Sequence, residues 1–162
     1  MKFKRTVLRD ALHIRKLISF HYFEFSRDYE FLGERHPFWE LLYVDKGEVG
    51  VPAGEKRYTL RQGDIIFHKP DEFHTVAACN ETAPNLVVIS FECGSAFMKH
   101  FEERLFQLSS EERNLLGLIV REGFHAFEPP FDMPHIHTLK RRKDAPAGSE
   151  QLIRLYMETL LI

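Results

Sequence analysis

The acidic and histidine side chains between residues 34 and 74 constrain the fold of this chain more than any other feature. Glu34 and His36 alternate, and Glu40 follows four residues after the histidine. His74 comes later, beyond a Gly-Asp turn at 63–64. Alternate residues of a β-strand share one face, so Glu34 and His36 point the same way on a strand. The pattern predicts that these side chains converge inside one small β-barrel, as a site for a metal ion or a polar ligand.

Short segments typical of β-strands surround this pattern. Glycine or proline separates most of them, and several are rich in aromatic and β-branched residues. We expect strands at 20–25, 39–45, 48–51, 56–60, 65–68, 75–78 and 85–91. Short strands at close spacing, with turn residues between them, predict a barrel or a sandwich.

Helical patterns replace the strand pattern near residue 95. We expect one helix at 95–106 and a second at 109–123. Ser109 and Glu112 have the spacing of a capping box at the start of the second helix. Gly123 stands where the C-cap of that helix is expected.

A proline-rich, basic segment at 124–148 separates the second helix from the end of the chain. Its basic run at 140–143 is typical of a solvated face. The segment 149–162 is amphipathic at helical spacing, which predicts a third helix. We therefore divide the chain into a barrel at 1–100, a helical segment packed on it at 101–123, the connector and the final helix.

Composition and charge exclude several classes of protein. The 162 residues fit one domain, and 44% apolar residues are enough to build a core. The formal charge of −2 lacks the basic excess of a nucleic-acid binder, so this chain alone is not expected to contact DNA. The first 16 residues have no apolar core, so we do not expect them to be a secretory signal, and no apolar run approaches the roughly 20 residues of a membrane helix. Cys79 and Cys93 fit reduced thiols, and a cytoplasmic location is expected.

Two interpretations of the polar cluster remain open from the residues alone. A mixed set of histidines and carboxylates suits one divalent first-row metal ion such as Zn, Ni, Fe or Mn. Such side chains near turns also often hydrogen-bond to the backbone or to each other. Around them, Phe38 and Phe67 are candidates to stack on a ligand, although aromatic residues more commonly pack in a core. Leu42 and Val44 would line the barrel if Glu40 points into it.

Three further histidines are expected to lie outside the ligand set. His68 ends a strand and is interpreted as a supporting or surface residue. His135 and His137 lie in the proline-rich connector and are interpreted as solvated loop residues.

Residues 34–47 and 63–74 resemble the two cupin motifs. The first matches from Glu34 through Gly47, except that Glu34 replaces the first histidine of the motif. The second matches at its Gly-Asp pair, at Pro70 and at His74, whereas the residues on either side of Pro70 depart from it. The sequence segments 38–47, 63–70 and 151–162 are similar to the N-terminal sensor region of AraC-type transcription regulators.

The resemblance implies a mainly β fold. A cupin-like double-stranded β-helix, also called a jelly-roll barrel, would be followed by C-terminal α-helices. A small-molecule effector would bind in the barrel, with a divalent metal ion as a candidate cofactor. The residues implied for this site are Glu34, His36, Glu40 and His74.

The resemblance also implies partners. The final helix of such regulators helps two chains to dimerise, here through a stripe of Leu152, Tyr156 and Leu160. DNA would be bound only through a C-terminal domain that residues 1–162 do not contain. Because the sequence stops inside an apolar helix, we expect the natural chain to continue. The alternatives are a metal-dependent cupin enzyme and a stand-alone cupin that binds a small molecule.

Overall fold

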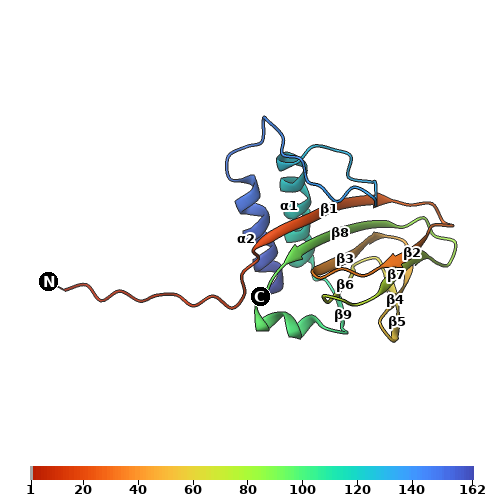
Figure 1. Cartoon of the computed structure of the whole chain (residues 1–162), viewed down its shortest axis with the longest axis horizontal. Coiled ribbons are helices and arrows are strands. Elements are labelled where there is room, and N and C mark those ends of the chain that lie inside the picture. The colour runs from red at the N-terminus through yellow and green to blue at the C-terminus, as the bar shows by residue number, and fades with distance from the viewer. Residues whose placement is uncertain (1) are drawn as a thin grey trace.

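Two antiparallel β-sheets form the body of the protein (Figure 1), as described by a computed structural model for residues 2–162. In the five-stranded sheet the order is β1 (Lys16–Glu24), β8 (Asn85–Glu92), β3 (Trp39–Lys46), β6 (Asp64–His68) and β9 (Leu105–Gln107). In the four-stranded sheet the order is β2 (Glu30–Glu34), β7 (His74–Ala78), β4 (Glu48–Ala53) and β5 (Lys56–Arg61). The expected mainly β, cupin-like barrel with C-terminal helices is confirmed.

The central strand β3 separates two cores because its side chains alternate between the two faces of the sheet. Leu41 and Tyr43 point to the outer face, where the helices pack. Leu42 and Val44 point into the barrel, between the two sheets. The pairing of Leu41 with Phe67 across β3 and β6 places Phe67 on the outer face as well.

The inner core fills the barrel at the end away from the polar cluster. Val44, Val49, Val51, Leu60 and Leu86 are all fully buried there. Burial of these side chains from both sheets removes apolar surface from water and holds the sheets together.

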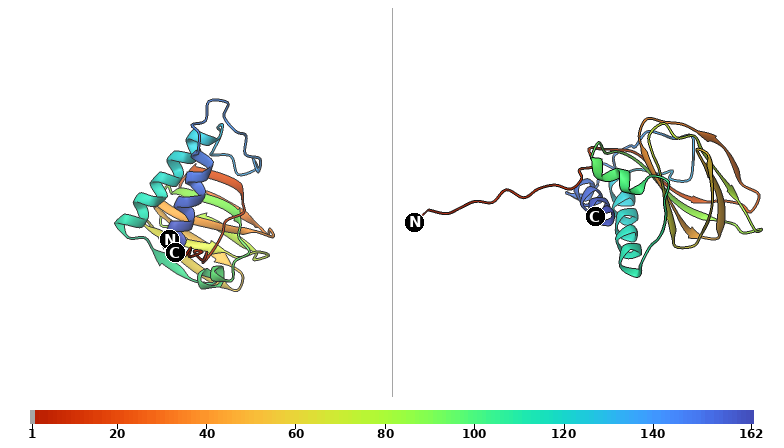
Figure 2. Two further views of the ribbon diagram at one scale, coloured as in Figure 1. Left: turned by 90° about the vertical axis from the view of Figure 1, so that its left-hand side faces the viewer. Right: turned by 90° about the horizontal axis from the view of Figure 1, so that it is seen from below.

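Two α-helices cover the outer face of the five-stranded sheet (Figure 2). They are α1 (Ser110–Ala126) and α2 (Ser149–Leu161). The predicted capping box is confirmed, because the Ser109 side chain accepts from the Glu112 N–H and the Glu112 side chain accepts from the Ser109 N–H. No helix within residues 2–162 is long and apolar enough to span a membrane.

The helix predicted at 95–106 is wrong in its second half. A short 3-10 helix, η1 (Ala96–Phe101), is followed by β9, which pairs with the edge of β6. Tertiary packing decides the outcome, because Phe101 and Phe106 pack around Phe67 on the outer face of the sheet.

Gly123 is not the predicted C-cap, because α1 continues for another turn to Ala126. A Cβ atom at position 123 would overlap the ring of Phe20 on β1. The glycine therefore allows the helix to approach the sheet closely.

The sequence did not predict β2, which is short and contains a glycine. It also placed the start of β1 at residue 20, whereas the strand begins at Lys16. The connector between the helices folds back on the molecule: Phe127 forms a β-bridge with Arg141, and the Phe131 carbonyl accepts a hydrogen bond from the Tyr22 N–H at 3.0 Å.

The predicted final helix is present as α2. Its fully buried stripe is Ile153, Met157 and Leu161, which faces the outer core. Leu152, Tyr156 and Leu160, expected at a dimer interface, flank this stripe and are half-buried within the single chain.

Candidate functional site

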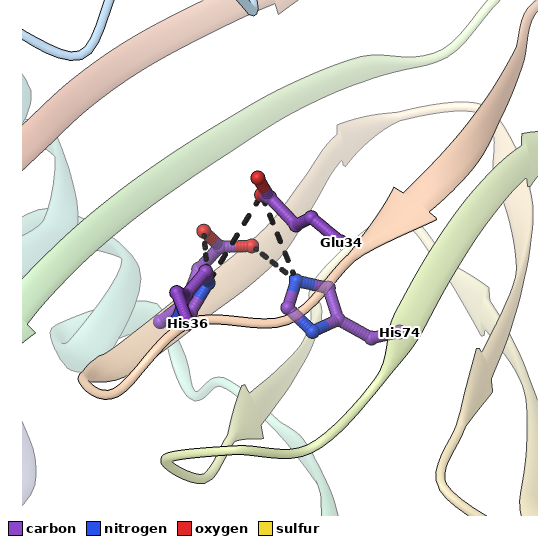
Figure 3. Close-up of side chains that lie close together, drawn as sticks. Glu34, His36 and His74 are labelled. Atoms are coloured by element: carbon purple, nitrogen blue, oxygen red, sulfur yellow. Dashed lines mark ion pairs between the residues drawn. The ribbon is translucent and has the colours of Figure 1, made fainter.

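The four predicted polar residues converge at one end of the barrel (Figure 3). One ligand atom from each lies within 4.8 Å of the others. His36 Nε2 lies 3.4 Å from Glu40 Oε2 and 4.0 Å from Glu34 Oε1. His74 Nε2 lies 3.3 Å from Glu40 Oε1 and 3.8 Å from Glu34 Oε1. Two carboxylates and two imidazoles thus face a common centre.

Strand pairing brings three of these residues together, whereas His36 lies in the loop between β2 and β3 and not on a strand with Glu34 as expected. Glu34 ends β2 opposite His74, which begins β7 in the same sheet. The register shifts between Phe31 and Glu34, where Gly33 has a φ of +108°. A bulge of this kind redirects the next side chain, and only glycine adopts this backbone conformation readily. Glu40 comes from β3 in the facing sheet, so the cluster joins the two sheets across the barrel mouth.

Backbone carbonyls orient both imidazoles. His36 Nδ1 lies 3.0 Å from the Phe38 carbonyl oxygen, and the ring stacks on Phe38 with centroids 4.0 Å apart. His74 Nδ1 lies 3.0 Å from the Glu72 carbonyl oxygen. When each Nδ1 carries the proton and donates it, both Nε2 lone pairs point at the cluster, as in metal-binding histidines.

Two serines that the sequence analysis missed support Glu40. The Ser90 hydroxyl donates to Glu40 Oε2 at 2.9 Å, and the Ser19 hydroxyl donates to Ser90 at 2.8 Å. All three residues are buried. Ser90 interrupts the apolar run of β8, which is the signal that could have identified it, whereas Ser19 lies on a strand with several other polar residues and gave no such signal.

The electrostatics of the cluster depend on its buried ion pairs. Burial raises the pKa of Glu40, but the adjacent imidazoles of His36 and His74 outweigh it and hold this pKa well below its usual range. Burial lowers the pKa of His74, but the adjacent carboxylates of Glu34 and Glu40 outweigh that effect and raise it to about 10. Without a metal ion the cluster is therefore held together by a protonated imidazole between two carboxylates.

His68 supports the cluster without joining it. Its ring is fully buried and stacks on His74 with centroids 3.9 Å apart. Its Nδ1 lies 3.3 Å from Glu72 Oε2. Burial lowers the pKa of His68, in spite of the opposing hydrogen bond to Glu72. The stacked ring fixes the plane of the His74 imidazole.

A cavity of about 60 Å³ opens beside the cluster. His21, Phe23, Phe25 and Tyr29 form a ladder of stacked rings along one wall, with adjacent centroids 3.5–4.9 Å apart. This wall comes from β1 and the turn that follows it, and it was not recognised in the sequence.

The connector also contributes to the cavity. Pro134 and His137 line it, and the Phe131 carbonyl oxygen lies 3.3 Å from His21 Nδ1. His137, expected to be a solvated loop residue, is exposed yet stands at the edge of the cavity, whereas His135 does not line it. The connector thus covers part of the barrel mouth.

Four further residues, Phe38, Leu42, Val44 and Phe67, were considered as candidates to line the site, and two of them do line the cavity. Phe38 and Leu42 line the cavity. Val44 faces into the barrel but lies deeper, in the inner core. Phe67 was placed wrongly, because its pairing with Leu41 turns it to the outer face of the sheet.

The donor atoms fit a divalent metal ion. His36 Nε2 and His74 Nε2 are buried without a hydrogen-bond partner, and both face carboxylate oxygens. Two imidazole nitrogens and two carboxylates match the preferences of Zn, Ni, Fe or Mn. A metal ion would satisfy the unpartnered nitrogens and balance the two acidic groups.

Comparison with solved structures finds proteins that resemble this chain. The chain is 10% identical to apo ToxT K231A from Vibrio cholerae, with a TM-score of 0.56 over 91% of this chain and 55% of that chain. A cupin protein with a double-stranded β-helix fold from Methanocaldococcus jannaschii is 13% identical, with a TM-score of 0.44 over 56% of this chain and 87% of that one.

A sequence relative and a family match extend the comparison. The HTH-type transcriptional regulator YfiF of Bacillus subtilis (strain 168) is 33% identical over 81 residues, or 48% of this chain. The match spans only 25% of the length of YfiF. Residues 19–116, which hold both sheets and the whole polar cluster, match the AraC-like ligand binding domain. The chain belongs to this family of AraC-like ligand-binding domains.

Proposed function

We propose that this domain senses a small-molecule effector for a transcription regulator. The observation that carries the proposal is the cavity in the barrel, where two carboxylates and two imidazoles meet beside a wall of stacked aromatic rings. Polar groups fix the orientation of a ligand and an apolar wall contributes contact area, which is the usual composition of a small-molecule site.

A metal ion is the second part of the proposal. Glu34, His36, Glu40 and His74 would hold one divalent first-row ion at the base of the cavity. Such an ion would act as a Lewis acid that attracts an oxygen or nitrogen atom of the effector. Ser90 and the Phe38 carbonyl would keep the ligands oriented through their hydrogen bonds.

The connector offers a route for the signal. Pro134 and His137 stand at the cavity, and the same segment leads into α2. An effector can shift a conformational equilibrium only by its difference in affinity for two states. We propose that an effector favours one position of the connector and thereby of α2.

Dimerisation and DNA binding complete the proposed mechanism. Two copies would pair through α2, with Leu152, Tyr156 and Leu160 at a self-complementary interface. DNA would be contacted by a separate domain of the regulator, in the cytoplasm. The double variant Leu152→Asp/Leu160→Asp should sediment as a monomer while its circular dichroism stays unchanged; a folded variant that remains a dimer refutes this interface.

Elemental analysis of the purified protein tests the metal site. We expect about one first-row metal ion per chain, which should be lost in His36→Ala/His74→Ala. His135→Ala is the matched control, because this histidine is exposed and lies outside the cluster. A metal-free wild-type protein that still binds effectors would assign the four side chains to direct hydrogen bonding instead.

An enzymatic role is a second candidate, favoured by the same set of histidine and carboxylate groups. Bound metal ions held by such groups also catalyse reactions of small molecules. Metal-dependent turnover of a small substrate that disappears in His36→Ala would support catalysis. Binding without turnover across a substrate panel would favour the sensor.

A further inference from the structure

The start of β1 passes beside α2 (Figure 1). A second hollow lies between these elements, outside the barrel. We call it the β1–α2 groove; it is lined by parts of residues 14–18, 137–141 and 150–157 together with Phe127. Its volume is about 730 Å³. Small-molecule sites commonly have volumes of about 300–1,000 Å³, so the groove is large enough for a ligand of its own.

Polar contacts hold the walls of the groove in place. Glu158 Oε1 accepts a hydrogen bond from the Ile14 N–H at 2.9 Å, which ties the chain before β1 to α2. Arg141 donates two hydrogen bonds to Glu150, at 2.7 and 3.0 Å, which ties the connector to the first turn of α2. The groove is therefore bounded by three segments that are linked to one another.

Cations dominate the lining, in contrast with the net negative charge of the chain. The lining contains one carboxylate, Glu150, and four cations, of which Arg141 pairs with Glu150. Lys16 pairs with Glu92 at 3.1 Å. Arg15 and Arg154 also line the groove, and neither forms an ion pair within residues 2–162.

The floor of the groove is apolar. Leu17 and Leu139 are partly exposed and line the groove above the buried Ile153 and Met157 of the outer core. An occupant must therefore combine an apolar body with negative charge. The N-terminal segment 2–9 does not fit this description, because its four charged residues are all basic.

We propose that the β1–α2 groove is a second binding site, for a small organic carboxylate with an apolar body. Arg15 and Arg154 bind the carboxylate, since guanidinium groups offer paired N–H donors that match its two oxygens. The apolar body lies on Leu17 and Leu139, above Met157. A ligand in this position contacts both β1 and α2, and its binding does not require an effector or a metal ion to be present in the barrel.

Calorimetric titration of the 162-residue chain with hexanoate tests the site. Hexanoate should bind, whereas hexanamide, which lacks the charge, and acetate, which lacks the apolar body, should bind at least about tenfold more weakly. Arg15→Gln and Arg154→Gln should each weaken hexanoate binding by about tenfold or more. Arg57→Gln on β5 is the matched control, because this exposed arginine is distant from the groove in the fold and its loss changes the charge equally.

A second measurement locates the ligand. With 13C-methyl-labelled methionine, hexanoate should shift the NMR signal of Met157, assigned with Met157→Leu, and leave Met98 unchanged. Equal binding of hexanamide, an equal loss in Arg57→Gln, or a shift at Met98 without one at Met157 would each overturn the proposal.

Discussion

The outer and inner faces of the five-stranded sheet bury very different side chains. The outer face, under α1 and α2, is closed by a large and almost wholly apolar core. The inner face is apolar at one end, but at the barrel mouth it buries Glu40, Ser19, Ser90 and His21. Buried polar and charged groups cost free energy unless they are paired. The outer core can supply the stability that allows the inner face to carry a polar site.

One strand serves both faces because its side chains alternate. Leu41 contributes to the outer core, while its neighbour Glu40 reaches into the polar cluster. A substitution on β3 or on the helices should therefore change either stability or the site, and rarely both. The following predictions test this separation.

The largest effect is expected from Ile119→Ala on α1. Ile119 is fully buried in the outer core, so truncation should lower the free energy of unfolding by about 2–5 kcal/mol, through lost burial and a cavity. Urea denaturation measures this change. Metal content should stay at the wild-type level, and its loss in the folded variant would contradict the separation of the two faces.

Gly123→Ala should also destabilise the outer face. The new Cβ atom would overlap the Phe20 ring, and overpacking of this kind costs about 1–3 kcal/mol. Gly117→Ala provides a control on the same helix, because nothing lies within 4 Å of a Cβ placed there. Removing that glycine should stabilise the helix by about 0.5–1 kcal/mol. Thermal melts of both variants should therefore shift in opposite directions, and a shift in the same direction would refute the close contact.

Ser90→Ala should act on the inner face. It removes the hydroxyl that donates to Glu40 Oε2, and loss of such a supporting contact typically weakens metal binding by about 10–100-fold. Competition with a chromogenic chelator measures Zn²⁺ affinity. Ser95→Ala is a suitable control, because the Ser95 hydroxyl accepts a hydrogen bond from the His13 N–H outside the barrel. Unchanged affinity in Ser90→Ala would show that the serine does not orient a metal ligand.

The sequence predicted features that depend on local spacing. Glu34, His36, Glu40 and His74 were identified from their motif spacing, and the structure brings them together, although His36 lies in a loop rather than on a strand. Most strands and the start of α1 also follow from local patterns.

Features that depend on register between distant strands could not be predicted in the same way. Ser90 reaches Glu40 only because β3 and β8 pair in one register, across 50 residues of sequence. Phe67 was assigned to the wrong face because its orientation depends on its pairing with Leu41. The connector, which has no regular period, gave no sign that Pro134 would stand over the barrel.

The smallest expected effect concerns the buried carboxylate of the outer face, Glu122 on α1. Burial raises its pKa, but the Arg121 guanidinium and other hydrogen bonds outweigh this and hold the pKa below the usual value of 4.5. A carboxylate with a lowered pKa stabilises the fold above its unfolded pKa, and this contribution is lost as pH falls through the folded pKa.

Glu122→Gln should therefore flatten the dependence of unfolding free energy on pH below about pH 4.5. The change should be under about 1 kcal/mol, because the Arg121 side chain is 55% exposed and the pair is screened by water. Urea denaturation between pH 3 and 6 measures it, with the exposed Glu111→Gln as the control. If both variants flatten the pH dependence of the unfolding free energy equally, the buried position of Glu122 adds nothing to its contribution to stability. A larger flattening in Glu122→Gln alone would show that the almost wholly apolar outer face also contains one paired charge that stabilises the fold.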